Sequence, residues 1–109
     1  MLKPGDVVLC YFVGAQGVKY RPAVVLSTDL YHANGADAVV GELTTQLAKT
    51  SQPTSYALHD WAAAGLKYPS VFRCCFSMII RADSRVIGRL TDRDWKEVQA
   101  RLLLALAVM

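Results

Sequence analysis

No apolar stretch of this sequence is long enough to cross a membrane. The closest, residues 102–109, is far shorter than the roughly 20 apolar residues that a membrane-spanning helix needs. At the other end, Lys3 and a Pro4-Gly5 turn stand where a signal peptide has its apolar segment. We therefore expect a cytoplasmic protein without a membrane partner.

Cysteine is scarce, and its odd count argues against a disulfide framework. The three cysteines are Cys10, Cys74 and Cys75. Cys74 and Cys75 are neighbours in an expected strand, so their side chains should point to opposite faces and not share a zinc ion. We expect all three to be small buried hydrophobic side chains in a reducing compartment. The sequence predicts no metal site and no cofactor.

The composition is that of one folded domain. A hydrophobic content of 53% over 109 residues excludes a disordered chain, and no linker, repeat or low-complexity segment divides it. We expect a single domain over residues 1–109. The formal net charge of +3 is mildly basic, which permits a nucleic-acid partner without requiring one.

Six short apolar segments bounded by turn residues predict β-strands. They span residues 7–13, 22–27, 38–43, 55–59, 70–80 and 85–90. Between them we expect a loop over residues 13–20, a polar connection over 29–35, a mobile surface loop over 44–54 and one helical turn over 60–65. Short strands with frequent turns are typical of a small β-barrel.

Only the C-terminal segment has the pattern of a long helix. Thr91 followed by Asp94 predicts a variant capping box at an exposed helix start, and apolar residues then recur at helical spacing. Residues 102–109 are apolar on every side, more than one packed face requires, which favours a homodimer. Trp61 and Trp95 are expected to anchor the core. The predicted fold is mainly β, a small barrel with a C-terminal helix.

Two of the expected strands carry polar side chains at their ends. Arg21 immediately precedes the strand that starts at Pro22, and Thr44 and Thr45 follow the strand over residues 38–43. A permanent cation and two hydroxyl groups at the ends of buried strands are suited to binding and reacting with a phosphodiester. Much of the functional interpretation depends on this pattern.

In their order along the chain, these segments resemble the MazF/PemK family of toxins from bacterial type II toxin–antitoxin modules, within the CcdB/PemK superfamily. The resemblance rests on Pro4-Gly5-Asp6, Arg21-Pro22-Ala-Val-Val-Leu, Val39-Val-Gly-Glu-Leu-Thr44-Thr45, Gly65-Leu66 with Ser70-Val-Phe-Arg73-Cys74, and Gly88-Arg-Leu before the helix. It implies an SH3-like barrel, a homodimer, a protein antitoxin, and a metal-independent endoribonuclease that cleaves single-stranded RNA.

The resemblance also implies roles for individual side chains. In metal-independent cleavage the RNA 2′-hydroxyl attacks the adjacent phosphate, and the protein stabilises the charged phosphorane. Arg21 and Arg73 are the candidates because a guanidinium grips two phosphate oxygens and stays charged, and Thr44 would donate a hydrogen bond to a phosphate oxygen. Four neighbouring residues are expected to bind RNA: Lys19, Tyr20, Thr45 and Gln46. Tyr20 would stack on a base and Lys19 would meet a phosphate.

Two departures from the family pattern leave alternatives open. The loop before Arg21 has neither the Glu nor the His that members carry, and Cys75 stands where some members have an acidic residue for proton transfer. His32 and His59 lie outside the family pattern, so the general base is unassigned. The alternatives are a non-catalytic growth inhibitor, as in related CcdB toxins that act on gyrase, and a module that binds operator DNA together with its antitoxin.

Overall fold

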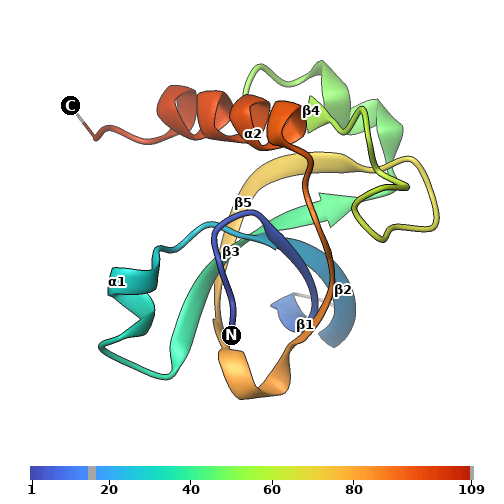
Figure 1. Cartoon of the computed structure of the whole chain (residues 1–109). Helices are drawn as coiled ribbons and strands as arrows, with labels where there is room; N and C mark the ends of the chain where they lie inside the picture. Colours follow the sequence, from blue (N-terminus) through green and yellow to red (C-terminus); the bar gives the residue numbers. More distant parts are fainter. Residues whose placement is uncertain (15–16, 109) are drawn as a thin grey trace.

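The computed structural model describes residues 1–14 and 17–108. Within this part, one antiparallel sheet contains β1 (Asp6–Gly14), β2 (Gly17–Val25), β3 (Asp37–Thr44), β4 (Tyr56–Ala57), β5 (Val71–Ile80) and β6 (Arg85–Arg89), in the order β4-β5-β3-β2-β1-β6. The sheet curls into a half-barrel, and helix α2 (Asp92–Ala105) lies across one end of it above β5 (Figure 1). The predicted mainly β fold with a C-terminal helix is confirmed.

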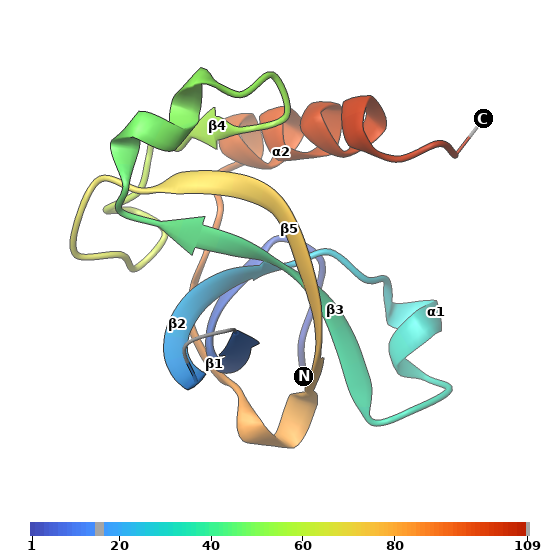
Figure 2. The same cartoon turned by 180° about the vertical axis from the view of Figure 1, so that it is seen from behind.

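The centre of the sheet is buried on both faces, and successive residues of a strand point to opposite sides of it. Val7 and its cross-strand partner Val24 belong to one buried cluster, whereas the next pair, Val8 and Ala23, belongs to the other. This explains why the strands are continuous apolar runs rather than alternating ones. Seen from behind, the curl encloses the chain's N-terminal segment, whose Leu2 packs in the second of these clusters (Figure 2).

Helix α2 and the segment after β4 close the first of these two faces. Val98 of α2 is fully buried there, and the predicted core positions of Trp61 and Trp95 are confirmed, since both pack against the same cluster. Gly65 has a φ of +90°, and a Cβ added at Gly65 or at Gly88 of β6 would clash with the opposite backbone. Backbone therefore packs on backbone, which fixes residues 66–70 beside β6.

The hairpin between β1 and β2 is longer than predicted. β2 begins at Gly17, which pairs with Gly14, so Lys19, Tyr20 and Arg21 lie on a strand and not in a loop. The glycines and the exposed side chains at its start resemble a loop in sequence, but pairing with the long apolar β1 extends the ladder. Two residues of the expected loop, Ala15 and Gln16, lie outside the described residues.

Two expected loops contain short helices. A turn of α-helix, α1 (Asp29–His32), follows Thr28, whose hydroxyl accepts a hydrogen bond from the Tyr31 amide. A 3₁₀ helix, η1 (Leu47–Ser51), lies in the segment expected to be a mobile loop, and a second, η2 (Arg81–Asp83), connects β5 to β6. Such short elements have no apolar periodicity to reveal them. Among the described residues, no helix is long and apolar enough to cross a membrane.

The predicted capping box at the start of α2 is wrong. The Thr91 side chain makes no cap hydrogen bond, and its hydroxyl donates instead to Asp60 at 2.6 Å. Asp94 is fully buried rather than exposed and accepts hydrogen bonds from outside the helix. Residues 60–65, expected to form one helical turn, form a hydrogen-bonded turn that ends at Gly65. Tertiary partners have replaced the local ones.

The structure separates the three cysteines by exposure. Cys10 is buried and Cys74 half-buried, with its thiol 3.4 Å from the Thr54 carbonyl oxygen, whereas Cys75 is exposed. The expectation that all three are buried is therefore wrong for Cys75. Burial raises the pKa of the Cys10 thiol to about 11 and also raises the pKa of Cys74.

A thiol reagent should therefore label the folded chain only at Cys75, because the thiolate is the reactive form and the buried thiols stay protonated. Titration with a chromogenic disulfide at pH 8 should give one reactive thiol per chain before denaturation and all three afterwards. Cys75→Ser should abolish the fast reaction. Fast labelling of Cys75→Ser would show that Cys10 or Cys74 is more accessible than the structure has it.

Candidate active site

The sheet register brings three charged side chains together. Glu42 of β3 pairs with Ala23 of β2 on one side and with Arg73 of β5 on the other. Arg21 lies two residues before Ala23 and on the same face, which makes it the diagonal neighbour of Glu42. The two arginines predicted from the sequence thus flank one glutamate.

The Glu42 carboxylate binds both guanidinium groups. Its Oε1 accepts a hydrogen bond from Arg21 at 3.1 Å, and its Oε2 accepts one from Arg73 at 2.9 Å. The Glu42 side chain is 12% exposed, against 34% for Arg21 and 25% for Arg73. The Arg73 Nε atom is buried and has no hydrogen-bond partner among the described residues. The carboxylate thus lies behind two partly exposed cations, and the group of three has a net charge of +1.

A bulge in β5 sets this pairing. Gly41 pairs with Phe76 and the next residue, Glu42, pairs with Arg73, so Cys74 and Cys75 are extra residues on β5. Bulges of this kind re-aim side chains near functional sites. Cys75, at the position of the acid expected from the family pattern, is exposed. The acidic group that contacts Arg73 is instead Glu42 of β3, a contact that no sequence motif predicted.

Arg21 and Thr44 line one small depression of about 250 Å³. Pro22, Leu43, Thr45, Gln46 and Ser70 complete its wall. The Thr44 hydroxyl accepts a hydrogen bond from the Gln46 amide at 3.2 Å, which leaves its own proton available to another acceptor. Four of the seven predicted site residues therefore meet here, and Arg73 is joined to them through Glu42.

Lys19 and Tyr20 lie farther along β2. Because neighbouring residues of a strand point to opposite faces, Lys19 shares the face of Arg21, whereas Tyr20 shares the face of Pro22. The Tyr20 ring packs against Tyr11 of β1, with the ring centroids 4.7 Å apart, and remains 48% exposed. The structure does not bring these two side chains into the depression, and their binding to RNA stays a prediction.

A larger cleft adjoins the depression. It has a volume of about 650 Å³ and lies between residues 65–70 and the β1 and β6 strands. Pro22, Thr45 and Ser70 line both hollows, so the two are adjacent. No motif in the sequence indicated this cleft, because its walls come from segments that are distant along the chain.

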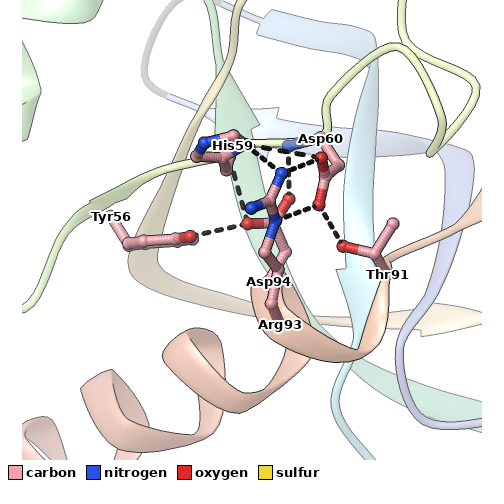
Figure 3. A network of polar contacts seen from close by, with 6 residues as sticks. All are labelled: Tyr56, His59, Asp60, Thr91, Arg93 and Asp94. Carbon is pink, nitrogen blue, oxygen red and sulfur yellow. Dashed lines mark hydrogen bonds and ion pairs between the residues drawn. The ribbon is translucent and has the colours of Figure 1, made fainter.

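Figure 3 shows a polar network that joins the segment after β4 to the start of α2. Asp94 is fully buried and accepts hydrogen bonds from the Tyr56 hydroxyl at 2.6 Å and from the amides of His59 and Asp60 at 3.0 and 2.7 Å. Hydrogen bonds from Arg93, which has the larger effect, and from Thr91 hold the pKa of Asp60 well below its usual range. These bonds make the network a structural connection between two elements.

The two histidines occupy structural positions. His32 is buried, and its Nε2 lies 2.6 Å from the Ser27 hydroxyl, which in turn accepts a hydrogen bond from the Val39 amide. His59 belongs to the network of Figure 3. Neither contacts Arg21 or Glu42 in the described structure. Within residues 1–14 and 17–108, no three His, Cys, Asp or Glu side chains are grouped as metal ligands would be.

Comparison with known proteins settles the family. The family described as PemK-like, MazF-like toxins of type II toxin–antitoxin systems matches residues 3–106. This chain belongs to that family. No curated protein matches the sequence.

Solved structures of MazF toxins share the fold of this MazF-like toxin. A mycobacterial endoribonuclease in complex with its cognate antitoxin superposes with a TM-score of 0.80 at 19% identity, covering 100% of this chain and 98% of that one. The Mycobacterium tuberculosis toxin MazF-mt6 gives 0.75 at 22% identity, covering 92% and 94%. MazF in a MazE–MazF crystal structure from Deinococcus radiodurans gives 0.74 at 17% identity, covering 99% and 97%. At these identities the likeness concerns the fold.

Proposed function

We propose that this MazF-like toxin is a metal-independent endoribonuclease that cleaves single-stranded RNA at the depression lined by Arg21 and Thr44. The observation that carries the proposal is the pair of partly exposed guanidinium groups that converge on Glu42, beside a threonine hydroxyl. Two cations at one strand end are suited to a phosphate whose charge increases during the reaction. Two of the solved relatives, both from mycobacteria, bear the name endoribonuclease, which agrees with this chemistry.

The reaction would proceed through the substrate's own 2′-hydroxyl. The 2′-oxygen forms a bond to phosphorus while its proton passes to solvent, and the bond from phosphorus to the 5′-oxygen breaks. The 5′-oxygen leaves with a proton from water, so the products are a 2′,3′-cyclic phosphate and a 5′-hydroxyl. Arg21 and Arg73 would stabilise the phosphorane, and Thr44 would donate to one of its oxygens.

Glu42 would act as a positioning residue. Its carboxylate is mostly buried behind the arginines and binds one N–H group of each. The Nε–H of Arg73 is buried, so the remaining N–H groups of the two guanidiniums, other than this one, would meet the phosphate. Two fixed cations cost less reorganisation during the reaction than two flexible ones, which is the origin of most electrostatic catalysis.

The deciding experiment is RNA cleavage by the purified protein in excess chelator, with both product ends mapped. Cleavage that yields cyclic phosphate and 5′-hydroxyl ends at the same rate with and without chelator supports the proposal. An intact substrate, in the presence of a protein that arrests growth when expressed, would favour the non-catalytic inhibitor instead. Cleavage restored only by added divalent metal would contradict the mechanism.

We further propose that the toxin is held in check by a cognate protein antitoxin and that the pair binds its operator DNA. Solved relatives occur in complexes with MazE or another cognate antitoxin. The alternative role as a gyrase-binding inhibitor gains no specific support from the site, because the paired arginines and the hydroxyl are suited to a phosphate.

We propose a homodimer as the working form. β5, the last turn of α2 and the residues that follow it expose large apolar side chains: Phe76, Met78, Leu103, Leu104, Leu106 and Val108, with exposed fractions from 38% to 68%. An adjoining hollow of about 440 Å³ has Leu26, Val39, Leu102 and Leu106 in its wall. Exposed apolar side chains gathered beside a hollow are a common mark of a protein–protein contact. Met109 lies outside the described residues.

Sedimentation at micromolar concentration should therefore give twice the 12.0 kDa of one chain. Leu103→Asp combined with Leu104→Asp should give a monomer, because a charge cannot be buried unpaired in an apolar interface. Val18→Asp, at a valine of β2 that is 63% exposed, provides the control and should remain a dimer. A monomeric wild-type protein at this concentration would rule the homodimer out.

A further inference from the structure

The cleft of about 650 Å³ next to the catalytic depression has the construction of a nucleotide-binding site. Its floor contains Leu9 of β1 and the paired Pro22 of β2, and the exposed Arg85 of β6, which pairs with Leu9 on the other side, lies at its rim. Leu66 extends the apolar surface, and Lys67 and Tyr68 stand on the opposite wall. The floor is thus apolar and the rim carries two cations and an aromatic ring.

The rim residues have no visible structural task. Lys67 and Arg85 are exposed, and neither forms an ion pair with any described residue. Tyr68 is 66% exposed and its ring packs against no other described ring. No acidic side chain is among the described residues that line the cleft. Unpaired cations around an apolar floor attract an anion that also has an apolar face.

Single-stranded nucleic acid fits that description. Its bases stack on aromatic and apolar side chains, and its phosphates meet lysine and arginine along the groove. The cleft is also adjacent to the depression that holds Arg21, since Pro22, Thr45 and Ser70 line both. An RNA chain with one phosphate at Arg21 would therefore enter the cleft within about one or two nucleotides of that phosphate. An acidic peptide would use the cations but would leave the Tyr68 ring without a stacking partner.

We propose that this cleft is a subsite for the nucleotide next to the scissile phosphate, with its base stacked on Tyr68 and its phosphates bound by Lys67 and Arg85. The proposal rests on the proposed ribonuclease function and extends it to residues that no sequence motif indicated. On the far side of Pro22 the same face leads to the Tyr11–Tyr20 ring pair, which would receive the strand as it leaves the cleft.

Binding can be measured without cleavage by using a 2′-O-methyl RNA oligonucleotide that contains a mapped cleavage sequence, because its blocked 2′-oxygen cannot attack. The logarithm of the association constant falls linearly with the logarithm of the salt concentration. We expect Lys67→Ala combined with Arg85→Ala to make this slope less steep by about 1.4, that is, about 0.7 for each lost phosphate contact. Lys3→Ala combined with Lys96→Ala removes the same charge elsewhere and should leave the slope unchanged. Lys67→Gln combined with Arg85→Gln repeats the test with longer side chains should the alanine variant not fold.

Tyr68→Ala separates stacking from charge. It should weaken binding by about 5- to 150-fold, the range measured for loss of one stacked base, without changing the salt slope. Tyr68→Phe keeps the ring and should bind as the wild-type protein does. Melting temperatures should be unchanged, because the three side chains are exposed.

The outcomes separate this proposal from the proposed function. If the wild-type protein cleaves RNA while the cation and tyrosine variants bind it with wild-type affinity and slope, the cleft is not a subsite and the ribonuclease remains. If the wild-type protein neither cleaves nor binds RNA, both proposals fail. If the variants lose affinity only for the antitoxin, the cleft is a peptide site and the proposal is overturned.

Discussion

Replacing Arg21 with alanine is expected to lower RNA cleavage by roughly 10²- to 10³-fold, the usual loss for one donor that stabilises a developing oxyanion. The melting temperature should change little, because the Arg21 side chain is 34% exposed and Glu42 keeps its bond to Arg73. Rates would be measured on a mapped RNA in chelator, together with thermal unfolding of the same samples. Arg21→Lys should recover only part of the activity, since an ammonium group cannot bind two phosphate oxygens in one plane.

Arg89→Ala is the matched control for Arg21→Ala. Arg89 is also a strand arginine that forms a single ion pair, with Asp6 at 3.0 Å, and it lies on β6 outside the depression. Its loss should leave cleavage at the wild-type level. An Arg21→Ala protein that cleaves RNA as fast as the Arg89→Ala protein would remove Arg21 from the mechanism.

A double-mutant cycle tests whether Glu42 acts through the arginines. Glu42→Ala should reduce cleavage by about 10²-fold, because a small displacement of a catalytic group has effects of that size. In the Arg21→Ala background, Glu42→Ala should reduce the cleavage rate by a factor at least about ten times smaller, since one of the two arginines that Glu42 positions is already absent. Fully additive losses would show instead that Glu42 takes part in the reaction independently of Arg21.

Asp94→Ala should have the largest effect on stability. The buried carboxylate accepts three hydrogen bonds, and its removal leaves the Tyr56 hydroxyl and the amides of His59 and Asp60 without their acceptor. At about 1–3 kcal/mol for each unpaired buried donor, the free energy of unfolding should fall by at least about 3 kcal/mol. For a domain of this size the melting temperature should fall by about 12 °C or more.

Asp92→Ala controls for the helix itself. Asp92 is exposed in the same first turn of α2, so its loss removes the same favourable interaction with the helix dipole but no buried hydrogen bond. The melting temperature of Asp94→Asn should lie between those of Asp94→Ala and Asp92→Ala, because an amide oxygen replaces only part of the carboxylate. If Asp94→Ala unfolds at the same temperature as Asp92→Ala, the network of Figure 3 contributes little to stability.

The sequence alone was sufficient for the long elements and for the family. Continuous apolar runs such as Val7 to Phe12 form strands because both faces of the sheet are buried, and the spacing of Trp95 and Val98 forms a helix because one face packs on the core. These patterns depend on neighbours a few residues away, so a single chain displays them. The shorter elements α1 and η1 were missed because one turn has no such periodicity.

Tertiary structure decided the acidic partner of the site and the start of α2. Glu42 stands in an ordinary apolar strand, and only the two-residue bulge at Cys74 and Cys75 aligns it with Arg73. The Thr91 and Asp94 pair satisfies a local capping rule, yet Asp94 gains stronger partners from a segment 34 to 38 residues away. Strand register and long-range hydrogen bonds depend on how the whole sheet curls, whereas propensity and periodicity depend on adjacent residues. The sequence therefore determined which long elements form, and the curled sheet determined which side chains meet.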